Sequence, residues 1–154
     1  MQLLQPDIVD IVEKTVQKTG INPKNLTLEV TEGLAIHDME RMIKILSDIK
    51  KIGVRIALDD FGTGYSSLNH IREIPFDVIK VDQSFVKDLD KDAYSQSFIK
   101  MVSELAETIG VSICVEGVET KEQYEILKHM KVRLVQGYYF DRPMPRKDFE
   151  EKYV

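Results

Sequence analysis

The chain has 154 residues, of which 43% are hydrophobic and 31% are charged, and its formal net charge is −5 with an isoelectric point near 5.3. This composition is typical of one soluble globular domain. The acidic balance, with no basic stripe along the sequence, argues against non-specific binding of DNA or RNA. No apolar run is long enough to cross a bilayer and no signal-peptide pattern is present, so we expect no membrane contact by this segment.

The single cysteine, Cys114, lies in a predicted strand and can form no intrachain disulfide. Free thiols persist in reducing compartments, so we expect a cytoplasmic location, even if a longer parent protein is anchored in a membrane through other domains. As a packing residue, a buried thiol behaves as a small apolar group.

Segments with the apolar pattern of a helix alternate along the chain with short apolar segments typical of strands. Apolar residues at helical spacing, bounded by Pro, Gly and capping residues, predict helices over residues 6–20, 38–53 and 94–109, a short helix from Ser66, one that starts at Thr120 and a terminal one near Lys147. In the helix over 94–109, the residues expected to face inward are Phe98, Met101, Val102, Leu105 and Ala106. Short apolar runs predict five strands, over residues 26–31, 54–59, 78–81, 111–116 and 132–135. This alternation predicts an α/β fold of parallel βα units.

Residues 54–68, VRIALDDFGTGYSSL, run from an apolar strand into two adjacent aspartates and a glycine-containing turn. Because side chains alternate along a strand, Asp59 faces away from the aliphatic residues. Asp60 begins a loop that Gly62 and Gly64 allow to turn tightly. Such a pair often only starts a turn, but two carboxylates at one strand end also suit a divalent metal ion.

A polar residue stands at or near the carboxyl end of each of the other four strands, on the face opposite the aliphatic side chains. These residues are Glu29, Lys80, Glu116 and Gln136. Parallel β/α folds bind their ligands at the carboxyl ends of the strands. Together with Asp59, the four residues therefore predict a site on one rim of the sheet.

Five motifs stand in order along the chain: E-V-T-E at 29–32, D-D-F-G-T-G-Y-S-S-L at 59–68, K-V-D-x-S-F-V at 80–86, E-G-V-E-T at 116–120 and Q-G-Y-Y-F-x-R-P-M-P at 136–145. Together they resemble the EAL domain of cyclic di-GMP phosphodiesterases, over essentially the whole chain. The resemblance implies a partial TIM-like (β/α) barrel, with about five of the eight parallel βα units. It also implies an enzyme of bacterial signalling that uses Mg²⁺ or Mn²⁺ to hydrolyse cyclic di-GMP to linear pGpG.

By motif position, the resemblance implies that Glu29 and Asp59 bind a first metal ion and that Asp60 binds a second. Lys80 matches the lysine that contacts the catalytic water and the developing charge. Glu116 matches a glutamate that acts as a second-metal ligand or as the general base. Two metal ions can stabilise both the attacking and the leaving oxygen of a phosphodiester.

Three further positions match supporting residues of the family: Glu32 the anchor of the loop 60–67, Glu119 an acid beside the base, and Gln136 a glutamine near the substrate. Ordinary structural roles remain open for some of these residues. A structural ion pair with Asp59 is the lesser alternative for Lys80. Glu32 also suits the first turn of a helix, and Glu119 a solvated loop.

The chain lacks the Glu-Ala-Leu motif that names the family, the arginine after it and the asparagine of the next strand, and it enters the family pattern at residues 2–7. A TIM barrel takes roughly 250 residues. We therefore expect residues 1–154 to form a single, N-terminally truncated EAL-type domain with an incomplete two-metal site. Weak metal binding and impaired hydrolysis follow from the smaller ligand set.

An open barrel exposes two strand edges, which predicts a homodimer or another oligomer that covers them. A second function remains open, namely a non-catalytic EAL-type cyclic di-GMP receptor or protein-interaction module. The retained acidic residues and Lys80 count against simple degeneration, since a pure receptor needs fewer of them. An unrelated metal-dependent β/α enzyme is the remote alternative: each motif alone is weak, but five of them stand in order.

Overall fold

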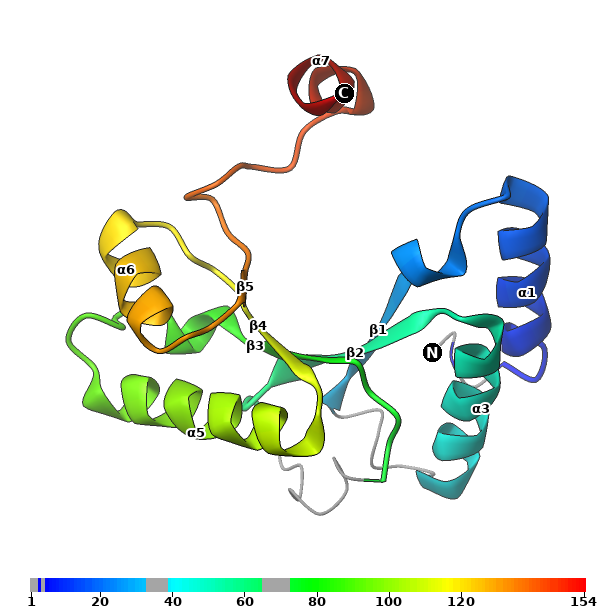
Figure 1. Ribbon diagram of the computed structural model, residues 1–154, viewed down its shortest axis with the longest axis horizontal. Helices are drawn as coiled ribbons and strands as arrows, with labels where there is room; N and C mark the ends of the chain where they lie inside the picture. The colour runs from blue at the N-terminus through cyan, green and yellow to red at the C-terminus, as the bar shows by residue number, and fades with distance from the viewer. Residues whose placement is uncertain (1–2, 4, 33–38, 65–72) are drawn as a thin grey trace.

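The computed structural model describes residues 3, 5–32, 39–64 and 73–154 (Figure 1). Its strands are β1 (Thr27–Thr31), β2 (Arg55–Phe61), β3 (Val78–Val81), β4 (Ser112–Val115) and β5 (Leu134–Val135). Its α-helices are α1 (Ile8–Thr19), α3 (Met39–Ile52), α5 (Ala93–Ile109), α6 (Lys121–His129) and α7 (Arg146–Tyr153). Two 3-10 helices, η1 (Pro23–Asn25) and η2 (Gln83–Phe85), precede β1 and follow β3.

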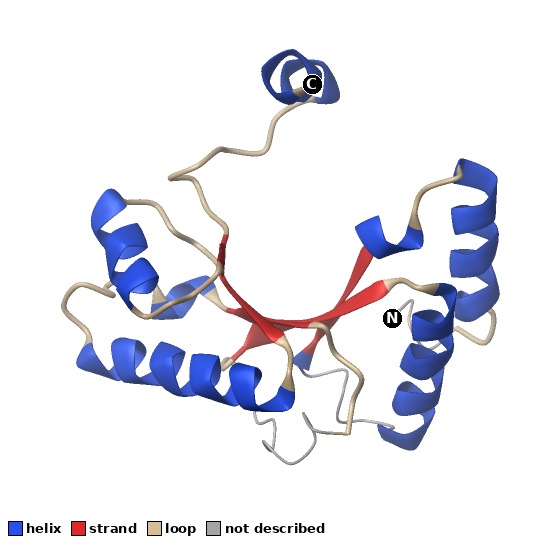
Figure 2. Ribbon diagram, viewed as in Figure 1, coloured by secondary structure: helices blue, strands red, loops and turns tan. Residues whose placement is uncertain are grey.

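The five strands form one sheet in the order β1-β2-β3-β4-β5, and every neighbouring pair is parallel. All carboxyl ends therefore lie at one edge of the sheet. Figure 2 shows a curved sheet with α3, α5 and α6 along its convex side and α7 apart from the rest. Among the described strands β1 and β5 do not pair with each other, so the sheet remains open. The predicted α/β fold of five parallel units is confirmed as an open part of a barrel.

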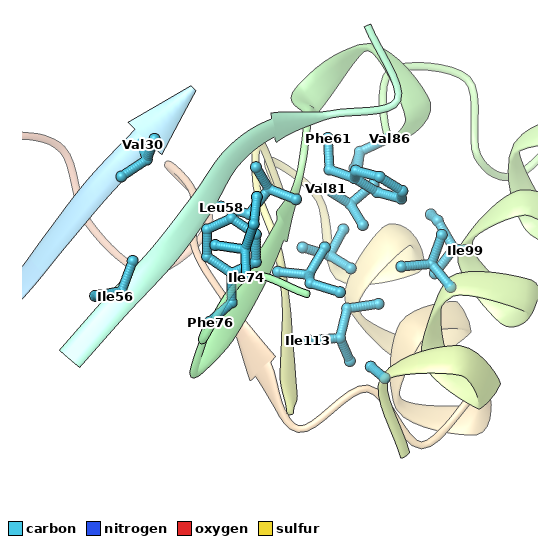
Figure 3. Packing of buried hydrophobic residues seen from close by; sticks show 14 of the residues in the cluster. Val30, Ile56, Leu58, Phe61, Ile74, Phe76, Val81, Val86, Ile99 and Ile113 are labelled. Carbon is cyan, nitrogen blue, oxygen red and sulfur yellow. The ribbon is translucent and has the colours of Figure 1, made fainter. Parts of the chain in front are cut away.

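The convex face of the sheet is apolar and makes the main core with the helices. Val30, Leu58, Ile79 and Val115, from four successive strands, are each at most 1% exposed. Figure 3 shows this packing, in which Ile99 of α5 faces the side chains of the sheet. Since one face of the strands is buried in this way, the alternate residues must face the concave side.

Local capping explains where the helices begin and end. The carboxylate of Asp92 accepts the amides of Tyr94 and Ser95 at the start of α5, and Gly110 ends that helix in the left-handed conformation with φ 75°. At the start of α6, Thr120 and Gln123 form a capping box, at the residue where the sequence predicted that a helix begins. These contacts fix the helix boundaries independently of tertiary packing.

Several details differ from the sequence prediction. β2 continues past Asp59 to Phe61, with an irregular register against β3 and with Asp60 at φ 57°. β5 has two residues instead of four, because the preceding residues 132 and 133 make no ladder. Met101 was wrongly placed inside, since it is 45% exposed, whereas Ile99 is fully buried. The predicted Asp38 start of α3 and the helix from Ser66 lie outside the described residues.

Within the described residues, no helix has both the length and the apolar content needed to cross a bilayer.

Candidate active site

Four strand ends bring one lysine and three carboxylates together on the concave side of the sheet. Lys80 Nζ lies 2.6 Å from Glu29 Oε1, 2.9 Å from Asp59 Oδ1 and 2.9 Å from Glu116 Oε1. The parallel register brings these side chains to the same end of the sheet. Glu29 pairs with Ala57 in β2, two residues before Asp59, so both side chains lie on the same face of the sheet. Four of the five predicted rim residues therefore converge, and the ion pair of Lys80 with Asp59 that was left open is present.

Lys80 is the buried centre of this cluster and is only 7% exposed. Burial favours the neutral amine, but the carboxylates of Glu116, Glu29 and Asp59 outweigh it and raise the pKa of Lys80 above its ordinary value. The side chain therefore carries a positive charge at neutral pH. It lies where that charge offsets the repulsion between carboxylates from three different strands.

Asp59 keeps one oxygen incompletely satisfied. Its Oδ1 is buried and accepts no hydrogen bond of good geometry from the described residues, although the ammonium of Lys80 is 2.9 Å away. Buried carboxylate oxygens normally have a hydrogen-bond or metal partner. Oδ1 of Asp59 therefore meets Lys80 by charge alone, without the hydrogen bond that a buried carboxylate oxygen normally has.

Asp59, Asp60 and Glu116 form a set with the chemistry of a hard-metal site. Each offers one carboxylate oxygen, and these oxygens lie within 4.8 Å of one another. Loss of hydration and the nearby charges of Asp59 and Asp82 raise the pKa of Asp60. Oxygen ligands of this kind suit Mg²⁺, Mn²⁺ or Ca²⁺. The unsatisfied Asp59 oxygen and this acidic set fit a divalent cation.

Glu32 supports the loop that follows Asp60. Its side chain is buried, and its Oε2 accepts the backbone amides of Gly62 at 3.1 Å and of Gly64 at 3.2 Å. A carboxylate that accepts two amides fixes a turn more strongly than water does. The residues of the predicted loop 60–67 from Tyr65 onward lie outside the described residues, but the contacts to Gly62 and Gly64 agree with an anchoring role.

Glu119 and Gln136 do not join the cluster in the described structure. Both are exposed, and no hydrogen bond or ion pair among the described residues connects their side chains to Lys80. Only the backbone of Gln136 is bonded nearby: its amide donates to the carbonyl of Val115, and its carbonyl accepts the amide of Val118. The supporting or substrate-binding roles of these two residues stay predictions.

Two side chains beside the site were not singled out from the sequence. Phe85 of η2 lies against the loop after β2, and Gln123 of α6 connects the loop after β4 to the end of η2. Their signals were present in the motif K-V-D-x-S-F-V and in the capping box at Thr120. From the sequence, the first pattern was interpreted only as a family motif, and Thr120 only as the start of a helix.

Cys114 pairs in register with Lys80 in the neighbouring strand. Burial, and then the negative charge of Glu116, raise the pKa of the Cys114 thiol to about 11. The thiol therefore stays protonated near neutral pH, where a protonated thiol is a poor nucleophile. Cys114 is a packing residue, as the sequence suggested.

The sequence comparison agrees with this geometry. A family model described as the EAL domain matches residues 1–143. The chain is similar to the cyclic di-GMP phosphodiesterase NbdA of Pseudomonas aeruginosa, with 36% identity over 144 residues that make up 94% of this chain and 18% of the relative. It is also similar to MucR of the same organism, a bifunctional diguanylate cyclase/cyclic di-GMP phosphodiesterase, with 35% identity over 94% of this chain and 21% of the relative. The chain spans about a fifth of the length of these curated relatives.

Solved structures give the same result. The PaMucR phosphodiesterase in complex with c-di-GMP superposes with a TM-score of 0.91 at 34% identity, over 96% of this chain and 60% of that one. Klebsiella pneumoniae BlrP1 in a manganese/cy-diGMP complex superposes with a TM-score of 0.86 at 33% identity, over 92% of this chain and 36% of that one. Because the family model covers residues 1–143 of its 154, this chain belongs to the EAL domain family.

Proposed function

We propose that the chain carries the catalytic rim of a metal-dependent phosphodiesterase that hydrolyses cyclic di-GMP to linear pGpG. The observation that carries this proposal is the contact of Lys80 with three carboxylates from three other strand ends, next to the Asp59, Asp60 and Glu116 set. The named activities of NbdA and MucR support the choice of substrate. The manganese and calcium complexes of BlrP1 support a divalent cation.

The proposed ligands of the cation are Glu29, Asp59, Asp60 and Glu116. When bound, Mg²⁺ or Mn²⁺ supplies positive charge to the phosphate and lowers the pKa of a coordinated water. Lys80 keeps its proton, because the surrounding carboxylates raise its pKa. Its ammonium therefore offers a fixed charge to a phosphate oxygen that becomes more negative during attack.

Glu116 is the proposed general base, since its carboxylate stands at the end of β4 beside Lys80. A carboxylate there can take the proton of an attacking water, while the ammonium at 2.9 Å holds it in place. Glu32 is proposed to anchor the loop that carries the second ligand, Asp60. Glu119 and Gln136 are proposed to assist from the rim.

The isolated chain is proposed to hydrolyse cyclic di-GMP poorly. The described residues form a five-stranded sheet in which β1 and β5 do not pair, so the concave side is open and the ligand set is small. Metal affinity follows the number and charge of the ligands. The predicted cytoplasmic location and homo-oligomeric state stay predictions, and the oligomer is a way to cover the open edges.

The test measures both binding and hydrolysis of cyclic di-GMP by this chain, with Mn²⁺, with Mg²⁺ and with EDTA, beside a Glu116→Gln variant. We expect metal-dependent binding and slow formation of pGpG that the variant abolishes. Fast, metal-dependent turnover would show that five strands suffice and would overturn the proposed impairment. Metal-independent binding without turnover favours the receptor alternative, and failure to bind cyclic di-GMP at all contradicts both.

A further inference from the structure

The short helix η2 lies between the two loops that carry the proposed metal ligands. It begins two residues after the end of β3, and the carboxylate of its N-cap Asp82 accepts the amide of Ser84 at 2.9 Å. This capping bond holds the turn in a defined shape. η2 therefore continues rigidly from the strand that carries Lys80.

On one side, η2 supports the loop after β2. Gly62 has φ 100°, and a Cβ atom there would lie 2.6 Å from Phe85 Cε2 and 2.7 Å from Phe98 Cζ. The two rings stack with their centroids 4.1 Å apart. The backbone at Gly62, two residues after Asp60, thus rests directly on an aromatic pair, and only glycine fits at this approach.

On the other side, η2 supports the loop after β4. Gly117 has φ 75°, and a Cβ atom there would lie 2.3 Å from Gln83 Cβ and 3.0 Å from Gln83 Cα. The residue before it is Glu116. An approach this close leaves room only for glycine and sets a lower limit on the distance between the two chain segments.

Gln123 of α6 adds a polar connection at the same place. Its Oε1 accepts the amides of Glu119 at 2.8 Å and of Thr120 at 3.0 Å, and its Nε2 donates to the carbonyl of Val86 at 2.9 Å. Gln123 is 7% exposed, and Val86 is the C-cap of η2. One buried amide group therefore joins the loop after β4 to the end of η2.

We infer that η2 and Gln123 form a positioning unit that sets the separation between Asp60 and Glu116 and so tunes the affinity of the site for a divalent cation. Phe85 holds the loop after β2, Gln123 holds the loop after β4, and η2 connects the two. This inference rests on the proposed metal-dependent function. Neither Phe85 nor Gln123 contacts a proposed ligand atom, so both act as positioning residues and not as catalytic ones.

The main test is Gln123→Glu, compared with Gln96→Glu as a matched control. A carboxylate at 123 still accepts the two loop amides but cannot donate to Val86 when ionised, so the connection to η2 is lost while the helix cap stays. Gln96 makes a similar bond, from its Nε2 to the carbonyl of Leu89 at 2.7 Å, and among the described residues its side chain makes no hydrogen bond to either loop. The measurements are the Mn²⁺ dissociation constant, from the EPR signal of free Mn²⁺, and the melting temperature.

We expect Gln123→Glu to weaken Mn²⁺ binding about tenfold relative to Gln96→Glu, the low end of the effect of outer partners of metal ligands. Both variants should lose stability, since both place a carboxylate against a carbonyl, and the more buried position 123 should lose more. Equal Mn²⁺ affinity in the two variants would overturn the inference and leave the metal site intact. Failure of the unmodified chain to bind Mn²⁺ would instead overturn the proposed metal dependence, and with it this inference.

A second variant serves if Gln123→Glu does not fold cooperatively. Phe85→Leu keeps an apolar contact under Gly62 but removes the stacked ring, and Phe149→Leu on the exposed side of α7 is its control. We expect a several-fold loss of Mn²⁺ affinity in Phe85→Leu, measured below its melting transition, and none in Phe149→Leu. An unchanged affinity in a folded Phe85→Leu protein contradicts the role of η2.

Discussion

Lys80 Nζ lies 2.6 Å from Glu29 Oε1, across the intervening strand β2 and 51 positions along the chain. The lysine is buried, whereas the side chain of Glu29 is 52% exposed. The contact therefore joins the edge strand of the sheet to the centre of the rim. It also places a cation between carboxylates that would otherwise repel one another.

Replacement of Lys80 by methionine should destabilise the fold and change how it responds to metal. Removal of the ammonium leaves Asp59 and Glu116 without their counter-charge, at a cost of about 2 kcal/mol, which is below the value for fully buried pairs because the carboxylates are partly hydrated. We expect Mn²⁺ to restore part of this loss, measured by urea unfolding with and without the ion. Lys100→Met, on the exposed side of α5, is the control. A Lys80→Met protein as stable as the unmodified chain would contradict the role of the cluster.

The contact between Glu32 and the loop after β2 can be tested by changing either the carboxylate or the glycine that it binds. The amides of Gly62 and Gly64 both donate to Oε2 of Glu32, so Glu32→Gln keeps an oxygen that can accept both but loses the charge that strengthens the two bonds. Gly64→Ala places a Cβ atom 3.0 Å from Glu32 Cδ, which pushes the carboxylate of Glu32 away from the amide of residue 64. We expect either change to weaken Mn²⁺ binding roughly tenfold, as for outer partners of metal ligands. Isothermal titration with Mn²⁺ checks this, and Glu104→Gln on α5 should have no effect.

The raised pKa of Asp60 predicts that this residue lowers the stability of the fold as pH rises. Its pKa is raised in the folded state, so the charged form costs stability, and that cost appears as pH rises from the unfolded pKa, about 3.9, through the higher folded value. Asp60→Asn removes the charge and tolerates the positive φ. The variant should therefore melt at a higher temperature than the unmodified chain at pH 7, with no difference at pH 3, while it loses Mn²⁺ affinity.

Asp48 is the control for that experiment, because its pKa is lowered in the folded state instead of raised. A hydrogen bond from Lys51 lowers the pKa of Asp48, so its charged form adds stability above the unfolded pKa and loses it as pH falls. Asp48→Asn should thus lower or leave unchanged the melting temperature at pH 7. If Asp60→Asn behaves in the same direction as Asp48→Asn, the charge on Asp60 is not destabilising.

Asp77 connects α3 to the amino ends of two strands. Its Oδ1 accepts Lys50 Nζ at 2.6 Å and its Oδ2 accepts the amide of Ile56 at 2.8 Å. Asp77→Ala leaves a strand amide unpaired and should cost about 2 kcal/mol of unfolding free energy. Asp77→Asn keeps an acceptor for Ile56 and loses only the partly exposed ion pair, so it should cost less than about 1 kcal/mol. Equal losses in the two variants would place the energy in the ion pair instead.

The open edges of the sheet predict self-association. β1 and β5 each pair on one side only among the described strands, and Leu134 of β5 is 43% exposed. Unpaired strand edges with exposed apolar residues attract a second chain. We expect light scattering after gel filtration to show a dimer or larger species, and Leu134→Lys to shift it toward monomer. A monomeric unmodified chain at micromolar concentration would contradict this.

The sequence by itself determined the order of elements and the face on which each polar residue lies. Helix boundaries follow from local signals such as the cap at Asp92 and the glycine at position 110, and strand faces follow from a period of two residues. Both are properties of a few neighbouring residues. Glu29, Asp59, Lys80 and Glu116 could therefore be assigned to one rim before any contact was known.

The tertiary structure alone decided how these residues meet. The parallel register brings three carboxylates to one ammonium, and the irregular pairing of β2 with β3 extends the strand through Asp60 at a positive φ. The support of Gly62 by Phe85 and the bridge from Gln123 to Val86 join segments 23 and 37 positions apart. Such contacts depend on how distant segments pack, which local periodicity and capping do not encode. The same packing leaves Glu119 and Gln136 at the rim without a side-chain contact to the cluster.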